Sequence, residues 1–143
     1  MRIINKKAKF NYNLSERFEV GIVLTGAEVK ALKTGRADLS NSYAKIVGGE
    51  AYLVNANIPA QGVQNYDATR SRKLLLHKNE LISLGTKMKQ KQLTLVPIRV
   101  YTKGRLVKAE IALAKSKRKF EKKESIKKKD IEREIDRELR GKE

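Results

Sequence analysis

Apolar residues in positions 1–113 of this chain come in short runs, and turn-forming residues bound each run. The run Leu95-Val96-Pro97-Ile98 is typical, and it is far shorter than the roughly 20 apolar residues that cross a bilayer. Short strands separated by turns give such a pattern, whereas long amphipathic helices do not. The pattern therefore predicts a mainly β fold with no membrane span.

Two turn signals predict β-hairpins. Gly48-Gly49-Glu50 supplies the positive φ angles of a tight turn, and Thr102-Lys103-Gly104 joins a second pair of apolar runs. The strands expected from these turns and from the other apolar runs are 18–24, 43–47, 51–54, 74–76, 93–101 and 105–113.

Residues 27–33 and 78–90 have the i, i+3, i+4 spacing of amphipathic helices. Thr34-Gly35 ends the first of them, because glycine readily adopts the positive φ on which helices commonly end. The positions grouped on one face are Val29, Leu32 and Lys33 in the first helix and Leu81, Leu84 and Met88 in the second. About six strands with two or three short helices predict a small OB-like β-barrel, a fold that offers a curved face to nucleic acid.

Charge divides the chain into two parts. Residues 114–143 hold 13 Lys or Arg and 8 Asp or Glu in 30 positions, too few apolar groups to fold alone. We therefore expect an RNA-binding barrel over 1–113 and a charged tail over 114–143 that is disordered in the free protein. The net charge of +17 requires a polyanionic partner. Nucleic acid is favoured over an acidic membrane, since no aromatic-bearing amphipathic helix accompanies the charge.

Residue types that carry catalysis are sparse. The chain has no cysteine and one histidine, His77, and it has no G-x-x-x-x-G-K-[ST] loop and no D-x-D pair. His77 lies where an apolar strand meets a helix and is interpreted as a structural residue near the helix start, with an RNA contact as the alternative. No enzyme activity, cofactor or metal is expected. The start of the chain turns polar too early for a secretory signal, which favours the cytoplasm.

Basic clusters are the positive signal for function. Residues 5–12 interleave lysines with amide and aromatic groups, which suit phosphates, base edges and unstacked bases respectively. Arg70-Ser71-Arg72-Lys73 and residues 115–123 form two further clusters. Three clusters on a chain of this charge predict an RNA-binding protein.

At these clusters the chain resembles the small protein B family, the SsrA-binding proteins of bacterial trans-translation. The similarity is most distinctive over 19–33, EVGIVLTGAEVKALK, and over 70–77, RSRKLLLH. Further blocks follow in order along the whole chain. They are Asn5-Lys6-Lys7-Ala8 with Tyr12, Asp38–Tyr43, Ala56-Asn57-Ile58, Leu95–Ile98, Tyr101 and Ala114–Arg118. Ser116 and Phe120 depart from the usual family pattern.

The resemblance implies a monomeric barrel that binds the tRNA-like domain of transfer-messenger RNA (tmRNA). It implies delivery of that RNA, together with elongation factor Tu, to the A site of stalled ribosomes. The tail is then expected to become helical in the empty mRNA channel, against small-subunit rRNA. No membrane partner is implied.

The resemblance also implies site residues, namely Asn5, Glu19 and Leu75 for RNA binding and Lys115, Lys117, Arg118 and Phe120 for the decoding centre. With the basic residues added, the RNA-binding candidates are Asn5, Lys6, Lys7, Tyr12, Glu19, Lys30, Arg70, Arg72, Lys73 and Leu75. The candidates for the decoding centre and mRNA channel are Lys115, Lys117, Arg118, Lys119, Phe120, Lys122, Lys123, Lys127, Lys128 and Ile131. Among the first group, Asn5 is expected to hydrogen-bond RNA directly. Glu19 is expected to accept bonds from base amino groups or 2′-hydroxyls, or to support a basic neighbour. Leu75 is expected in the core, or else as an exposed contact to unstacked bases.

Two other functions fit the same composition. A ribosomal protein is also small, basic and free of cysteine, but it binds ribosomal RNA permanently. An RNA-processing enzyme would need a catalytic group of residues that the sequence does not show. The RNA that co-purifies with the protein separates these alternatives.

Overall fold

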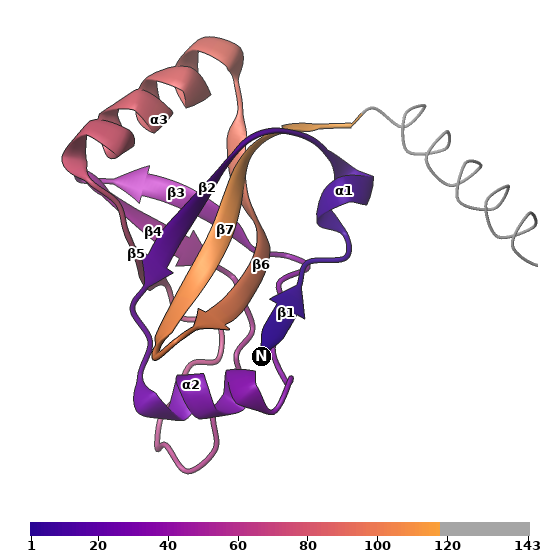
Figure 1. The fold of residues 1–143 in the computed structure, drawn as a ribbon, viewed down its shortest axis with the longest axis vertical. Coiled ribbons are helices and arrows are strands. Elements are labelled where there is room, and N and C mark those ends of the chain that lie inside the picture. Colours follow the sequence, from indigo (N-terminus) through magenta and orange to yellow (C-terminus); the bar gives the residue numbers. More distant parts are fainter. Residues whose placement is uncertain (118–143) are drawn as a thin grey trace, which may run out of the picture.

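The computed structural model describes residues 1–117, which form seven strands and three helices (Figure 1). The strands are β1 (Arg2–Ile4), β2 (Tyr12–Ile22), β3 (Tyr43–Val47), β4 (Glu50–Val54), β5 (Arg72–Leu75), β6 (Thr94–Lys103) and β7 (Leu106–Ser116). The helices are α1 (Ala8–Asn11), α2 (Gly26–Lys33) and α3 (Lys78–Lys91). None of these three helices is long and apolar enough to cross a bilayer.

All strand pairs are antiparallel, and six of the strands form a closed ring of pairings. The order β6-β3-β4-β5-β2-β7 returns to β6, and β1 joins β6 outside the ring. The contact between β3 and β6 is the shortest, with Ala44 opposite Leu95. The predicted mainly β class with short helices is confirmed, and the described strands form one antiparallel sheet whose pairings close through β6 and β7.

Both predicted hairpins are present. Gly48 and Gly49 have φ of 59° and 77° and form the whole turn between β3 and β4, so Glu50 already belongs to the strand. Gly104, with φ of 62°, lies in the turn between β6 and β7, where Lys103 pairs with Leu106. A two-residue turn with positive φ matches the twist of antiparallel strands, which explains why both signals were reliable.

Two strands extend further than the sequence predicts. β2 begins at Tyr12 instead of residue 18, and β7 continues to Ser116, beyond the predicted boundary at 113. The two extensions pair with each other, Tyr12 opposite Ser116 and Leu14 opposite Ala114. They are too polar to resemble apolar strands, but backbone pairing needs only a partner. β1 was not predicted because its three residues, Arg2–Ile4, are too few to give a strand pattern.

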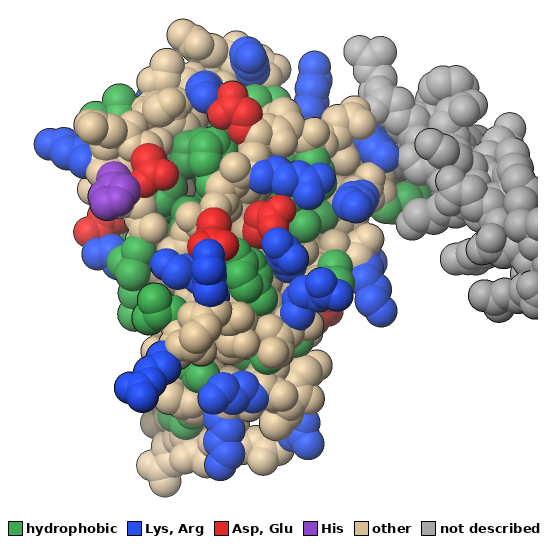
Figure 2. All heavy atoms as spheres, in the orientation of Figure 1, with side chains coloured by type: hydrophobic (Ala, Val, Ile, Leu, Met, Phe, Trp, Pro, Cys, Tyr) green, Lys and Arg blue, Asp and Glu red, His purple; other side chains and the backbone are tan. Residues whose placement is uncertain are grey.

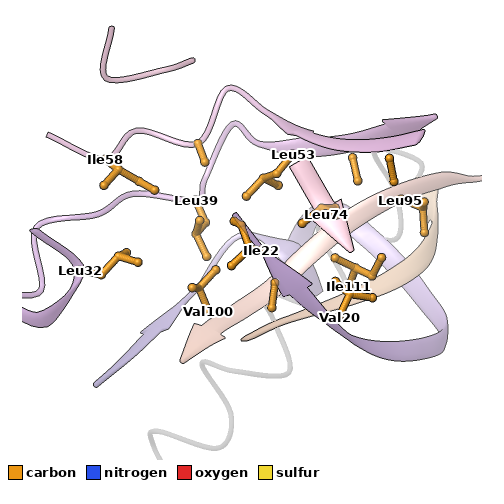
Figure 3. Packing of buried hydrophobic residues seen from close by; sticks show 14 of the residues in the cluster. Val20, Ile22, Leu32, Leu39, Leu53, Ile58, Leu74, Leu95, Val100 and Ile111 are labelled. Carbon is orange, nitrogen blue, oxygen red and sulfur yellow. The ribbon is translucent and has the colours of Figure 1, made fainter. Parts of the chain in front are cut away.

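The core lies inside the ring of strands (Figure 3). Leu53, Leu95 and Ile111 are 0% exposed and come from β4, β6 and β7. Leu32 of α2 and Leu84 of α3 are also buried, and the two helices lie at opposite ends of the sheet in Figure 1. The predicted face of α3 is the one that packs on the core, since Leu81 and Met88 also contact it. The face predicted for α2 is wrong by about one position, because the buried residues are Glu28, Ala31 and Leu32 while Lys33 is exposed.

Helix α2 brings a carboxylate into this interior. Thr25 caps the helix, accepting a hydrogen bond from the N–H of Glu28 at 3.2 Å, while Glu28 Oε1 accepts from the N–H of Thr25 at 2.9 Å. Glu28 is 0% exposed and also pairs with Arg72, which is itself 0% exposed, at 2.7 Å. Arg70 donates to both oxygens of Glu28, and the hydroxyl of Tyr66 lies 3.0 Å from Oε2. We call Glu28, Tyr66, Arg70 and Arg72 the Glu28 network.

The Glu28 network keeps its carboxylate ionised. Burial alone would raise the pKa of Glu28, but hydrogen bonds from Arg70, from the Thr25 backbone and from Arg72 outweigh it and lower the pKa from 4.5 to about 2. Because the folded pKa lies below the unfolded one, the network stabilises the fold fully above pH 4.5. That stabilisation is lost as the pH falls toward 2.

Replacing Glu28 with Gln is expected to lower the free energy of unfolding at neutral pH by about 3–5 kcal/mol, because it leaves the buried Arg72 without a counterion. The variant should also lose less stability than the parent between pH 4.5 and 2. Urea unfolding followed by circular dichroism at several pH values measures both effects.

Glu50→Gln is the matched control, since it breaks an exposed pair with Lys73 and should change the unfolding free energy little. Equal acid sensitivity of the Glu28 variant and the parent would contradict the assigned role.

Candidate nucleic-acid interface

Charged residues gather on the outer side of β2, β7 and β6, the strands at the front of Figure 2. Alternation along each strand explains the gathering, because Val20, Val100 and Ala109 point into the core and their neighbours point out. The strand register places the outward residues side by side. We call these residues the outer face; they are Arg17, Glu19, Arg99, Tyr101, Lys103, Lys108 and Glu110.

Two carboxylates organise the cations of the outer face. Glu110 Oε2 accepts from Arg99 Nε at 2.8 Å, and its other oxygen lies 3.5 Å from Arg17 Nη1. The guanidinium of Arg99 lies over the ring of Tyr101, 4.8 Å from its centre. Such contacts hold long side chains in fixed positions and so reduce the entropy lost when a ligand binds.

Glu19 is the second of these carboxylates. It accepts hydrogen bonds from the hydroxyl of Tyr101 and, at 3.2 Å, from Lys103 Nζ. The Tyr101 bond and then the Lys103 bond lower the pKa of Glu19, while burial and the Glu19 carboxylate raise the pKa of Tyr101 to about 12. Glu19 therefore remains an ionised acceptor among cations, which accords with both roles expected for it.

Asn5 is more buried than a residue expected to hydrogen-bond RNA directly. It is 7% exposed, and its backbone N–H and side-chain Nδ2 donate to the carbonyls of Ile98 and Pro97 at 2.8 and 2.9 Å. Its Oδ1 is buried and has no hydrogen-bond partner among residues 1–117. This burial leaves little of Asn5 open to the direct contact that was expected. Asn5 fixes the segment that presents the exposed Lys6 and Lys7.

The Arg70–Lys73 cluster is split by the strand. Arg72 points inward and is fully buried in the Glu28 network, so the prediction that it contacts RNA is corrected. Its neighbours differ, since the side chain of Arg70 is 35% exposed and that of Lys73 is 45% exposed and paired with Glu50 at 3.0 Å. Alternation in a strand separates residues that are adjacent in sequence.

Leu75 lies outside the core, contrary to the first expectation for it. Its side chain is 53% exposed, and it lies opposite Gly21 of β2. Its position permits the other expectation for Leu75, that of an exposed apolar contact to unstacked bases. Lys30 on α2 is exposed and Tyr12 is half-buried at the start of β2.

The tail candidates fall mostly outside the described residues. Lys115 is exposed near the end of β7, and the N–H of Lys117 donates to the carbonyl of Asn11 at 2.9 Å. The remaining candidates lie beyond residue 117; they are Arg118, Lys119, Phe120, Lys122, Lys123, Lys127, Lys128 and Ile131.

Four outer-face cations, Arg17, Arg99, Lys103 and Lys108, were not predicted from the sequence. Arg17 is far from the other three in the chain, and the four residues form no basic run. Arg99, Tyr101 and Lys103 do alternate along the sequence, which places them on one side of a strand. His77 immediately precedes α3, and its backbone N–H donates to Glu80 Oε1 at 3.0 Å, as expected of a residue at the helix start. Residues 1–117 contain no group of His, Asp and Glu that could hold a metal ion.

Comparisons with known proteins show the family to which the chain belongs. The family model described as SmpB protein matches residues 2–141. An SsrA-binding protein of Sulfurihydrogenibium sp. (strain YO3AOP1) is 51% identical over 96% of this chain and 93% of its own length. The SsrA-binding protein of Persephonella marina is 47% identical over the same shares.

A solved structure has a similar fold. It is described as "tmRNA-SmpB: a journey to the center of the bacterial ribosome" and has a TM-score of 0.70 and 40% identity. The match covers 87% of this chain and 94% of the other. On the family model and these relatives together, the chain belongs to the SmpB protein family.

Proposed function

We propose that this protein is a tmRNA-binding adaptor of trans-translation, which binds the tRNA-like domain of tmRNA and delivers it to the A site of stalled ribosomes. The excess of cations on the surface of the body carries the proposal. Residues 1–117 hold 22 Lys or Arg and 8 Asp or Glu around an apolar interior, so the excess cations lie on the surface. An RNA backbone is the natural counterpart of such a surface. The relatives' name, SsrA-binding protein, narrows the RNA to tmRNA.

Exposed cations take the phosphate contacts in this proposal. Lys6 and Lys7 precede α1, Lys30 lies on α2, and Lys73 lies on β5. Glu19 accepts hydrogen bonds from base amino groups or 2′-hydroxyls, since a carboxylate cannot attract phosphate. Asn5 and Arg72 act by holding the segments that carry these residues.

The tail has a separate role in the proposal. Lys115, Lys117 and the basic residues after them contact small-subunit rRNA at the decoding centre and in the mRNA channel. Delivery as a monomer with elongation factor Tu completes the proposal. The attachment of Lys117 to Asn11 supports this division, because it fixes where the tail leaves the body.

The RNA that the protein binds in the cell distinguishes a tmRNA adaptor from a ribosomal protein. Sequencing the RNA recovered with the purified protein separates the two, because the adaptor should enrich tmRNA and a ribosomal protein should enrich rRNA.

Binding to a transcribed tRNA-like domain of tmRNA is expected to weaken steeply with salt. Each neutralised phosphate contributes roughly 0.7–0.9 to the slope of log K against log salt, so contacts from several basic clusters give an absolute slope of about 3 or more. Filter binding at a series of salt concentrations measures it. A slope near zero would refute binding dominated by phosphates.

Removing residues 118–143 is expected to leave binding to the isolated RNA within about threefold, because that segment holds 11 cations and 8 anions and contributes little net charge. Peptide tagging on stalled ribosomes should be lost. The truncation begins at residue 118 because Lys115 and Ser116 pair with β2, and removing them would shorten the sheet.

Lys6→Ala combined with Lys7→Ala serves as the comparison variant, and it should weaken RNA binding more than the truncation does. If the truncation costs more affinity than the loss of these two lysines, the separation of body and tail is wrong.

A further inference from the structure

A groove of about 1130 Å³ lies between α3 and the sheet, and we call it the α3 groove. Its helix side includes Leu81, Ile82 and Met88, and its strand side includes Ile46. Ile82 is 59% exposed, while the other three are half-buried against the core. Leu84 is the only buried residue of α3, so the helix leaves an apolar floor that is open to solvent.

Lysines line both sides of the α3 groove. They are Lys78 and Lys89 on the helix and Lys45, Lys73 and Lys108 on the strands. Glu50 also lines the groove, but it is already paired with Lys73 at 3.0 Å. An occupant that complements the groove therefore carries an apolar stripe with negative charge along both of its sides.

Residues 130–140 of the tail have that pattern in the sequence. In a helix, Ile131, Ile135 and Leu139 would form one apolar stripe. The same spacing places two acidic residues along each side of the stripe and the arginines on the opposite side. The acids are Glu132 and Asp136 on one side and Glu134 and Glu138 on the other, and the arginines are Arg133, Arg137 and Arg140. With five Asp or Glu against three Arg, this segment is acidic in a chain whose net charge is +17.

The described part of the chain ends beside α3. The helix ends at Lys91, and Thr94, three residues further on, pairs with Ala114 near the end of β7. The linker formed by residues 118–129 can span up to roughly 40 Å when extended, whereas α3, with 14 residues, is about 21 Å long. Residues 130–140 can therefore reach any part of the α3 groove.

We propose that residues 130–140 dock in the α3 groove as a helix while the protein is free of RNA, and that bound RNA displaces them. A helix this short is unstable alone in water, and the apolar floor supplies the partner that it lacks. Over these residues, the docked helix takes the place of the disorder expected of the free tail.

Docking makes the tail depend on RNA. Lys73 and Leu75, which are RNA-binding candidates, line the same groove, so the docked helix and the RNA compete for them. The tail is then available to the ribosome only after RNA has bound. This displacement rests on the proposed function above, whereas docking itself does not.

Disulfide trapping in the full chain tests docking, since the chain has no cysteine of its own. The pair Ile82→Cys with Ile135→Cys should form an intramolecular disulfide under a mild oxidant. Adding Glu134→Gln and Glu138→Gln should slow that reaction by roughly two- to fourfold, because each ion pair at the rim contributes a factor of about two.

Leu106→Cys with Ile135→Cys is the matched control. Leu106 is 60% exposed in the β6–β7 hairpin and does not line the α3 groove, so the tail meets it without docking. The two glutamine substitutions should leave the rate of this pair unchanged. Equal slowing of both pairs, or slowing of neither, would overturn the proposal.

Binding to the transcribed tRNA-like domain tests displacement. Ile135→Gln in the full chain removes the central apolar contact without changing the charge, and it should strengthen RNA binding by about two- to threefold. A docked population of about two thirds has this effect, because only the undocked third can bind. The gain lies within the threefold change expected when residues 118–143 are removed.

Ile126→Gln is the control for displacement, since Ile126 lies outside residues 130–140, and it should leave the affinity unchanged. A gain for Ile135→Gln no larger than that of this control would overturn the proposal. If trapping of the Ile82 pair succeeds but the parent protein binds no tRNA-like RNA, the proposed function fails and docking stands.

Discussion

The buried ion pair between Glu28 and Arg72 is the interaction on which the rest of the structure depends. It joins α2 to β5, and Arg72 also donates to the carbonyls of Ala56 and Ala68, so the intervening loop is held to the same point. Two charges without water are costly unless every polar atom is paired, and Tyr66 and Arg70 supply the missing partners. The Glu28 network therefore fixes one end of the ring of strands. It also uses Arg70 and Arg72, two residues of the basic cluster 70–73, to stabilise the fold.

Carboxylates paired with cations also order the surface, as Glu28 does the interior. Glu19 and Glu110 lie among the cations of the outer face and bind Tyr101, Lys103 and Arg99. They offset two of the four positive charges of the outer face, and their contacts with Arg17, Arg99 and Lys103 set the positions of these long side chains. A basic surface organised in this way can favour one RNA shape, whereas unpaired lysines attract any polyanion.

Strand β5 adds an apolar element to this surface. Leu75 is flanked by Lys73 on the same strand and lies opposite Gly21, so one short strand contributes a charge and an apolar contact side by side. Cations give affinity that depends on salt, and apolar contacts give affinity that does not. Together they suit an RNA with both a folded backbone and exposed bases.

The sequence by itself determined the β class, both hairpins, helices α2 and α3, and the polyanionic partner, because turn glycines, apolar spacing and net charge act locally or over the whole chain. Only the tertiary structure decided what single residues do. Arg72, adjacent to two exposed cations, is buried because its strand position points inward. Leu75, in an apolar run, is exposed because its position points outward. The outer face joins Arg17 on β2 to Lys108 on β7 through the pairing of these two strands, and that pairing depends on contacts between segments far apart in the chain, which no turn between them sets.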